Sequence, residues 1–158
     1  MIVDAAPNHF SIKVANFGGS AAQSVRDSQD IVAIRMRVFQ NEQGVTPELE
    51  FDGLDETATH FLAYDGERAI GTARVRFLNS HTAKLERVAV LPDLRKHGVG
   101  RKIVETVLEF LANKNISDLR IHAQISVVAF YQKLGFVTEG EPFDEAGIPH
   151  IKMSYKFP

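Results

Sequence analysis

One stretch, residues 84–124, limits what this chain can fold into more than any other, because strand-like and helix-like patterns alternate there around a glycine-punctuated loop. A strand-like run ends at Val90, and the loop that follows contains Gly98 and Gly100. Apolar residues then recur with the helical period of about 3.6 residues, and an alternating run over 119–123 is typical of another strand. This strand–loop–helix–strand order predicts a mixed α/β sheet with its chemistry at the loop.

The other elements follow from periodicity and turn residues. The patterns predict strands over 10–15, 60–64, 69–77 and 83–90, a first helix from an N-cap at Ser28 to Gln43, a short helix over 127–134, and two further strands around 136–138 and 151–157. The turns Asp65-Gly66 and Asn79-Ser80 are short, so the three central strands are expected to form an antiparallel meander. Residues 46–57 carry only acidic charges and are expected to form an acidic loop or broken helix.

Composition narrows the class of protein. The chain has 158 residues, 44% of them hydrophobic, which suits a single domain over residues 1–158. Its 18 basic and 20 acidic residues give a net charge of −2, so neither nucleic acid nor a membrane is an expected partner. The absence of cysteine excludes disulfides and a thiol nucleophile. The start, Met1 to Pro7, does not resemble a signal peptide, so we expect a cytoplasmic protein. The histidine spacing predicts no metal site.

The loop after Val90 has the features of an anion site. A helix N-terminus attracts phosphate, and glycines allow a close approach to the backbone. Four cations surround Gly98 and Gly100, namely Arg95, Lys96, Arg101 and Lys102. The spacing matches neither a P-loop nor a dinucleotide fingerprint. Taken alone, the motif fits several phosphate ligands, or simply a turn that needs glycine.

Two motifs together resemble a known superfamily. The run Leu85-Glu86-Arg87-Val88-Ala89-Val90-Leu91-Pro92, followed by Arg95-Lys96-His97-Gly98-Val99-Gly100, resembles the pyrophosphate-binding motif of the GNAT acetyltransferases. The run Ala129-Phe130-Tyr131-Gln132-Lys133-Leu134-Gly135-Phe136 resembles the family segment that carries a tyrosine facing the coenzyme sulfur. A narrower likeness to the ElaA-like branch rests on Val38-Phe39, Glu42-Gln43, Asp52, Asp55, and the pattern from Glu145 through His150 to Met153.

The resemblance implies a single-domain GNAT-type α/β fold with a mixed, mostly antiparallel sheet flanked by helices, and acetyl-CoA as co-substrate. Backbone groups of Val88 and Val90 would bind the pantetheine arm. The implied cofactor contacts are Val88, Ala89, Val90, Arg95, Lys96, His97, Gly98, Val99, Gly100, Arg101, Gln124 and Phe130. Gln124 stands where the family often has asparagine.

Residue chemistry offers candidates for the catalytic roles. Tyr131 can protonate the leaving thiolate, and its alternative is a tyrosine packed in the core. Glu86 is the candidate base, although a carboxyl pKa of about 4.3 lies far below that of an amine, and its alternative is a solvated residue paired with a cation. We expect Glu42, Glu145 and His150 near the acceptor, with His150 as base or orienting group and a satisfied buried histidine as its alternative.

Other polar residues have ordinary structural explanations. We expect His60 and His122 to serve packing or local hydrogen bonding. The acidic residues 48–56 form either a solvated face, which is the favoured interpretation, or a mouth for a cationic amine.

The sequence therefore predicts an N-acetyltransferase that passes an acetyl group from acetyl-CoA directly to an amine of a small molecule or peptide, within a ternary complex. The alternatives are a non-catalytic acyl-CoA-binding sensor or interaction module, and a nucleotide-binding domain. Homodimers are common in the superfamily, and no feature of this sequence decides whether this chain forms one.

Overall fold

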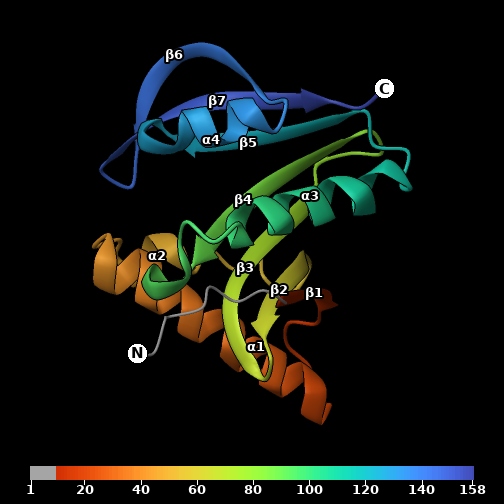
Figure 1. The fold of residues 1–158 in the computed structure, drawn as a ribbon, viewed down its shortest axis with the longest axis vertical. Helices are drawn as coiled ribbons and strands as arrows, with labels where there is room; N and C mark the ends of the chain where they lie inside the picture. The colour runs from red at the N-terminus through yellow and green to blue at the C-terminus, as the bar shows by residue number, and fades with distance from the viewer. Residues whose placement is uncertain (1–9) are drawn as a thin grey trace, which may run out of the picture.

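Figure 1 shows the computed structural model, which describes residues 10–158, as a twisted sheet with helices on both of its faces. The helices in chain order are α1 (Ala22–Arg35), the π-helix η1 (Met36–Glu42), α2 (Pro47–Glu50), the 3₁₀ turn η2 (Pro92–Leu94), α3 (Val99–Ala112), the 3₁₀ turn η3 (Ile125–Val127) and α4 (Val128–Lys133). The strands are β1 (Phe10–Ala15), β2 (Thr59–Asp65), β3 (Arg68–Phe77), β4 (Thr82–Val90), β5 (Asp118–Gln124), β6 (Val137–Glu145) and β7 (Ile148–Lys156).

The strands lie in the order β1-β2-β3-β4-β5-β7-β6. Neighbouring strands are antiparallel except β4 and β5, which are parallel because α3 carries the chain back across the sheet between them. The expected antiparallel meander is β2-β3-β4. The prediction of a mixed, mostly antiparallel sheet flanked by helices is therefore confirmed.

Two apolar clusters hold the helices to the sheet. On one face, Ile103 and Val107 of α3 are fully buried together with Leu119 of β5, and α4 joins the same cluster. On the other face, Ile31 and Ile34 of α1 pack against the sheet in a smaller cluster. Because side chains alternate along a strand, the two faces of β4 and β5 look into different surroundings.

The predicted start of the first helix is wrong. The helix begins at Ala22, and Ser28 lies inside it, where its hydroxyl donates to the Ser24 carbonyl at 2.7 Å and accepts from the Gly18 N–H at 2.9 Å. Asp27 likewise accepts from the Asn16 N–H at 3.2 Å. Serine and aspartate are typical of a helix start. Here they lie inside the helix and accept hydrogen bonds from the preceding loop.

The last two strands are longer than their patterns indicate and form a hairpin over 137–156. Strand β6 lies at an edge of the sheet and most of its residues are exposed, so it shows little apolar alternation. Gly140, with a φ of 73°, lies at an irregularity in its pairing with β7. This hairpin forms one wall of the site.

Candidate active site

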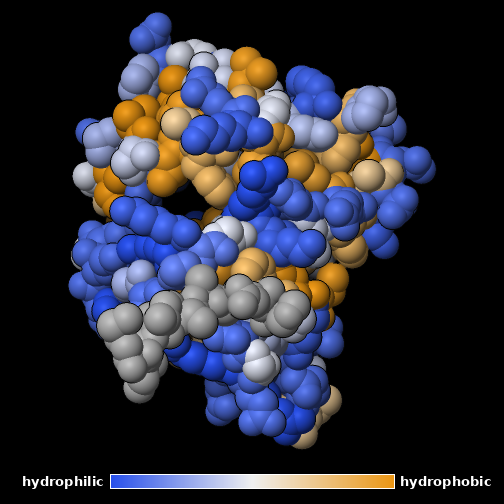
Figure 2. All heavy atoms as spheres, in the orientation of Figure 1, coloured by the Kyte–Doolittle hydropathy of each residue, from blue (hydrophilic) through white to orange (hydrophobic). Residues whose placement is uncertain are grey.

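The sheet opens between its two parallel strands. Strands β4 and β5 are paired only over residues 82–85 and 118–121, and they diverge beyond Leu85 and Ile121. A cleft of about 1040 Å³ occupies this opening, and residues of η1, β4, α3, β5, α4 and β7 line it. Figure 2 shows the surface hollowed between the part that carries β5–β7 and the part that carries α1 and α2. Most of the predicted site residues line this one cleft.

Strand β4 presents free backbone groups to the cleft. Its one edge pairs with β3 as far as Val90, whereas the edge facing β5 loses its partner after Leu85. Arg87, with a φ of 56°, is the extra residue of a bulge between β3 and β4. Beyond that bulge, residues 88–90 have no strand partner on the open edge, and the Val90 carbonyl accepts from Arg95 Nε at 3.1 Å, so the remaining backbone groups on this edge need partners. They fit an extended amide-containing arm such as pantetheine.

The glycine loop has the predicted anion-site geometry. Gly98 has a φ of 83° and immediately precedes α3, whose first N–H groups have no acceptor within the helix. A Cβ at Gly100 would lie 3.6 Å from Phe130 Cζ and 3.8 Å from Val90 Cγ2, two side chains that line the cleft. The glycine therefore keeps this part of the cleft open, and the residues present fit a ligand with phosphate groups.

The cations of the loop are not equivalent. Lys96 and Arg101 line the cleft, whereas His97 does not. Arg95 also lines it, but its guanidinium forms a bidentate pair with Glu42 at 2.5 Å and donates from Nε to the Val90 carbonyl at 3.1 Å. Glu42, placed near the acceptor by sequence reasoning, thus contacts the cofactor loop. This pair links η1 to the end of β4.

Tyr131 lies on the opposite wall of the same opening. Its ring is buried and packs edge-on against Phe130 and Phe136, with centroids 5.0 and 5.4 Å away. Burial raises the pKa of the Tyr131 hydroxyl. The phenol therefore remains protonated at neutral pH, as a proton donor to a thiolate must be.

Glu86 does not have the surroundings of a general base. Its carboxylate is ion-paired with Arg74, with Arg76 at 2.8 Å and with Lys84 at 3.3 Å. Burial raises its pKa, but the hydrogen bonds and charges of the three cations outweigh burial and lower the pKa to about 2. Such a carboxylate is a poor proton acceptor, so the geometry argues against the base role and agrees with the alternative of a residue paired with cations.

The acidic segment 48–56 was expected to be a solvated face or an acidic mouth. Glu50, Asp52 and Asp55 are instead paired with arginines. Glu50 is bound by Arg35, and Asp55 lies 2.7 Å from Arg35 and 3.0 Å from Arg74. Asp52 pairs with Arg74 at 2.8 Å. Arg35 and Arg74 have almost no exposed surface, and sequence reasoning missed both of them. The available signal was an arginine within each otherwise apolar helix and strand pattern, since a buried arginine requires acidic partners.

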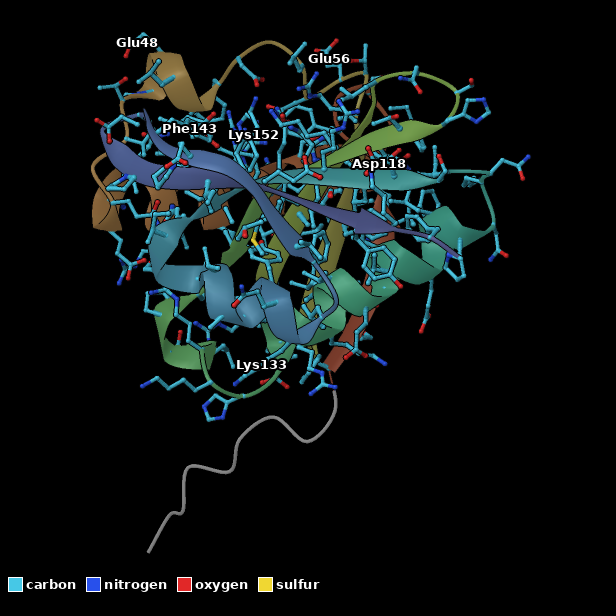
Figure 3. All side chains as sticks on the ribbon, turned by 90° about the horizontal axis from the view of Figure 1, so that it is seen from above. Glu48, Glu56, Asp118, Lys133, Phe143 and Lys152 are labelled. Atoms are coloured by element: carbon cyan, nitrogen blue, oxygen red, sulfur yellow. The ribbon has the colours of Figure 1, made fainter. Side chains whose placement is uncertain are left out.

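Three polar side chains from the last strands gather across the cleft from Glu86. His122 Nδ1 lies 2.9 Å from Glu145 Oε1, and His150 Nε2 lies 3.6 Å from Glu145 Oε2. The ring of Phe143 packs against both imidazoles. Figure 3 places Phe143 on the side of the sheet that carries α2, and Lys133 of α4 on the other side. The predicted pair of Glu145 and His150 is therefore joined by His122, for which sequence reasoning had expected packing or a local hydrogen bond.

Gln124 closes one side of the opening. Its side-chain amide donates to Gln43 Oε1 at 3.0 Å and so links β5 to the segment after η1.

Within residues 10–158, no group of three or more His, Asp or Glu side chains is arranged to hold a metal ion. In the same part of the chain, no helix is long and apolar enough to cross a bilayer.

An opening between parallel strands, with an anion site at one end and a buried proton donor on its wall, is that of a coenzyme A-dependent N-acyltransferase. The family model described as an acetyltransferase (GNAT) domain matches residues 24–157, and the chain belongs to the GNAT acetyltransferase family. The predictions of the family, of the fold and of an acyltransferase are confirmed.

One relative supports the family, and two solved structures share the fold. The Bacillus subtilis protein named as the uncharacterized N-acetyltransferase YjcF is 36% identical over 84% of this chain and 94% of its own length. The crystal structure of Escherichia coli ElaA superposes with a TM-score of 0.81 at 24% identity, over 94% of this chain and all of that one (100%). A GNAT family acetyltransferase from Elizabethkingia anophelis, solved with acetyl-CoA bound, gives a TM-score of 0.71 at 17% identity over 95% and 99% of the two chains.

Proposed function

We propose that this protein transfers an acetyl group from acetyl-CoA to the amine of a small molecule or peptide, directly and within a ternary complex. The observation that carries the proposal is the opening between β4 and β5, where the glycine loop, the free edge of β4 and Tyr131 all meet one cleft. Residues from both faces of the sheet line the cleft, so the two substrates would approach each other from opposite sides.

The residues divide into binding and proton-transfer roles. The first N–H groups of α3, with Lys96 and Arg101, would hold the phosphates, and the free edge of β4 at residues 88–90 would hold the pantetheine arm. The bound co-substrate supplies an acyl thioester. Tyr131 would then give its proton to the leaving sulfur, because a phenol is protonated at neutral pH.

A thiol-release assay with acetyl-CoA and a panel of primary amines tests the proposal. We expect release of free CoA with at least one amine, and a loss of about 100-fold or more in kcat for Tyr131→Phe. Stabilisation of the folded protein by acetyl-CoA should be the same in both proteins. If acetyl-CoA stabilises the wild type yet no amine releases CoA, the protein is a non-catalytic acyl-CoA-binding module and the proposal is wrong.

Gly100→Ala tests the phosphate site separately. The added methyl group makes only ordinary contacts within the protein, at 3.6 and 3.8 Å, so the domain should fold with unchanged or slightly higher stability. The same methyl group enters the cleft, and we expect the thermal stabilisation by acetyl-CoA to fall sharply. Gly98 is a less clean test, because its φ of 83° strains any other residue. If acetyl-CoA stabilises Gly100→Ala as much as the wild type, the phosphates do not bind at this loop.

A further inference from the structure

Transfer to an amine requires a base on the side of the cleft where the acceptor would bind. The strands on that side carry two groups without a role in the steps above, His122 and Glu145. Strand β5 alternates between the faces of the sheet, with Ile121 and Ala123 buried in the α3-side cluster. His122 therefore lies on the opposite face, at the first position after the last residue of β5 that pairs with β4. Glu86 is the corresponding first unpaired residue of β4 on that face. The two side chains thus mark the point where the strands begin to diverge.

We propose that His122, oriented by Glu145, is the general base that takes the proton from the acceptor amine. This inference rests on the acyl transfer proposed above. The carboxylate of Glu145 can only accept a hydrogen bond, so the contact of 2.9 Å from His122 Nδ1 requires a proton on that nitrogen. In the neutral ring, Nε2 then carries the lone pair. No hydrogen bond engages Nε2 within residues 10–158, and His122 lines the cleft with 26% of its side chain exposed.

The two other candidates are occupied. His150 donates from Nδ1 to the Ile148 carbonyl oxygen, 2.6 Å away, so this nitrogen carries the proton and the other nitrogen faces Glu145 at 3.6 Å. Glu86 is held by three cations, with a pKa of about 2. With that pKa, Glu86 lies roughly eight pKa units below an aliphatic ammonium, whereas the Nε2 lone pair of His122 takes part in no hydrogen bond within residues 10–158. The imidazole is the far better acceptor.

The proton and bond changes balance without another reactant. His122 Nε2 takes one proton from the acceptor ammonium, and the amine nitrogen forms a bond to the acyl carbon as the carbon–sulfur bond breaks. Tyr131 protonates the sulfur. The nitrogen then loses a second proton, which leaves the amide neutral, and this proton returns to Tyr131 through solvent. His122 releases to water the proton that it accepted.

Kinetics of His122→Gln and His122→Ala, with acetyl-CoA and the amine panel, test the role. We expect kcat with an aliphatic amine to fall about 100-fold or more in both variants, with unchanged stabilisation by acetyl-CoA. An aromatic amine, which is already neutral at pH 7, should lose less than about 10-fold. Free imidazole should partly restore His122→Ala. The matched control is His81→Gln, an exposed histidine outside the cleft, which should keep the wild-type rate.

The tautomer of His122 provides a readout that does not need turnover. In spectra of ¹⁵N-histidine-labelled protein, assigned with His122→Gln, we expect Nδ1 protonated and Nε2 bare at neutral pH, and a changed signal in Glu145→Gln. A proton on Nε2 instead would overturn the orienting contact. Wild-type turnover that survives in His122→Gln within about threefold would overturn the base while leaving the acyl transfer intact. Absence of wild-type turnover would refute the acyl transfer, and with it the base role, whatever the tautomer.

Discussion

Replacing Glu86 by glutamine should show whether this residue serves stability or chemistry. The three cations around the carboxylate lower its pKa from 4.5 to about 2, and only 9% of the side chain is exposed. A depressed pKa in the folded state means that the ionised form stabilises the fold above pH 4.5, and that this contribution is lost as the pH falls toward 2. The difference of about 2.5 pKa units corresponds to about 3 kcal/mol at pH 7.

Urea unfolding of the wild type and Glu86→Gln measures this contribution. We expect the variant to be less stable by about 3 kcal/mol at pH 7 and by about 2 kcal/mol at pH 3.5, because part of the stabilising ionisation is already lost there. The melting temperature should fall by roughly 6–12 °C. Turnover should remain within about 10-fold of the wild type under conditions where the variant is folded.

The exposed Glu109 of α3 is a matched control for the loss of one negative charge, and Glu109→Gln should change the free energy of unfolding by less than about 0.5 kcal/mol. If Glu86→Gln is as stable as that control but loses about 100-fold or more in kcat, the ion-pair argument is refuted and Glu86 is the base.

Two further experiments test how the cleft is built. Gly71→Ala would place a Cβ 2.8 Å from Cδ1 of the fully buried Ile103, so we expect a loss of about 1–3 kcal/mol in the free energy of unfolding, measured in urea; wild-type stability would show that α3 can move. A double-mutant cycle of Glu42→Ala and Arg95→Ala should give a coupling of no more than about 1 kcal/mol, because both side chains are about one-third exposed. A much larger coupling in thermal or urea unfolding would mean that this pair behaves as a buried one.

The geometry of the glycine loop and of the segment around Tyr131 was predictable because its signals are local. The glycines at 98 and 100 occur within one loop, and the left-handed conformation of Gly98 is the backbone demand that the sequence motif expresses. Tyr131 follows the same logic, since its neighbours Phe130 and Phe136 in the sequence are also its packing partners in space. Contacts between residues that are close in the sequence do not depend on strand order, so the sequence predicts them well.

The acceptor side was not predictable in the same way, because its contacts join distant segments. Arg35 lies 15 residues from Glu50 and 20 from Asp55 in the sequence, so no local spacing shows that these charges meet. His122 and Glu145 are 23 residues apart in the sequence and come together because the β6–β7 hairpin, whose turn follows Glu145, is paired to β5 through β7. Both the buried ion pairs and the imidazole–carboxylate contact therefore depend on strand order.

The same strand order explains why acid and base should lie on opposite faces of the sheet. Tyr131 belongs to the apolar α3-side cluster, where it is buried, and among the residues the structure describes no charged side chain perturbs its hydroxyl. The opposite face holds the buried arginines, and the Glu86 carboxylate, whose pKa Arg74 helps to lower, is a poor proton acceptor there. A base on this face must therefore stand beyond those arginines. The far side of the opening, where β5 meets the hairpin of β6 and β7, satisfies that condition with His122.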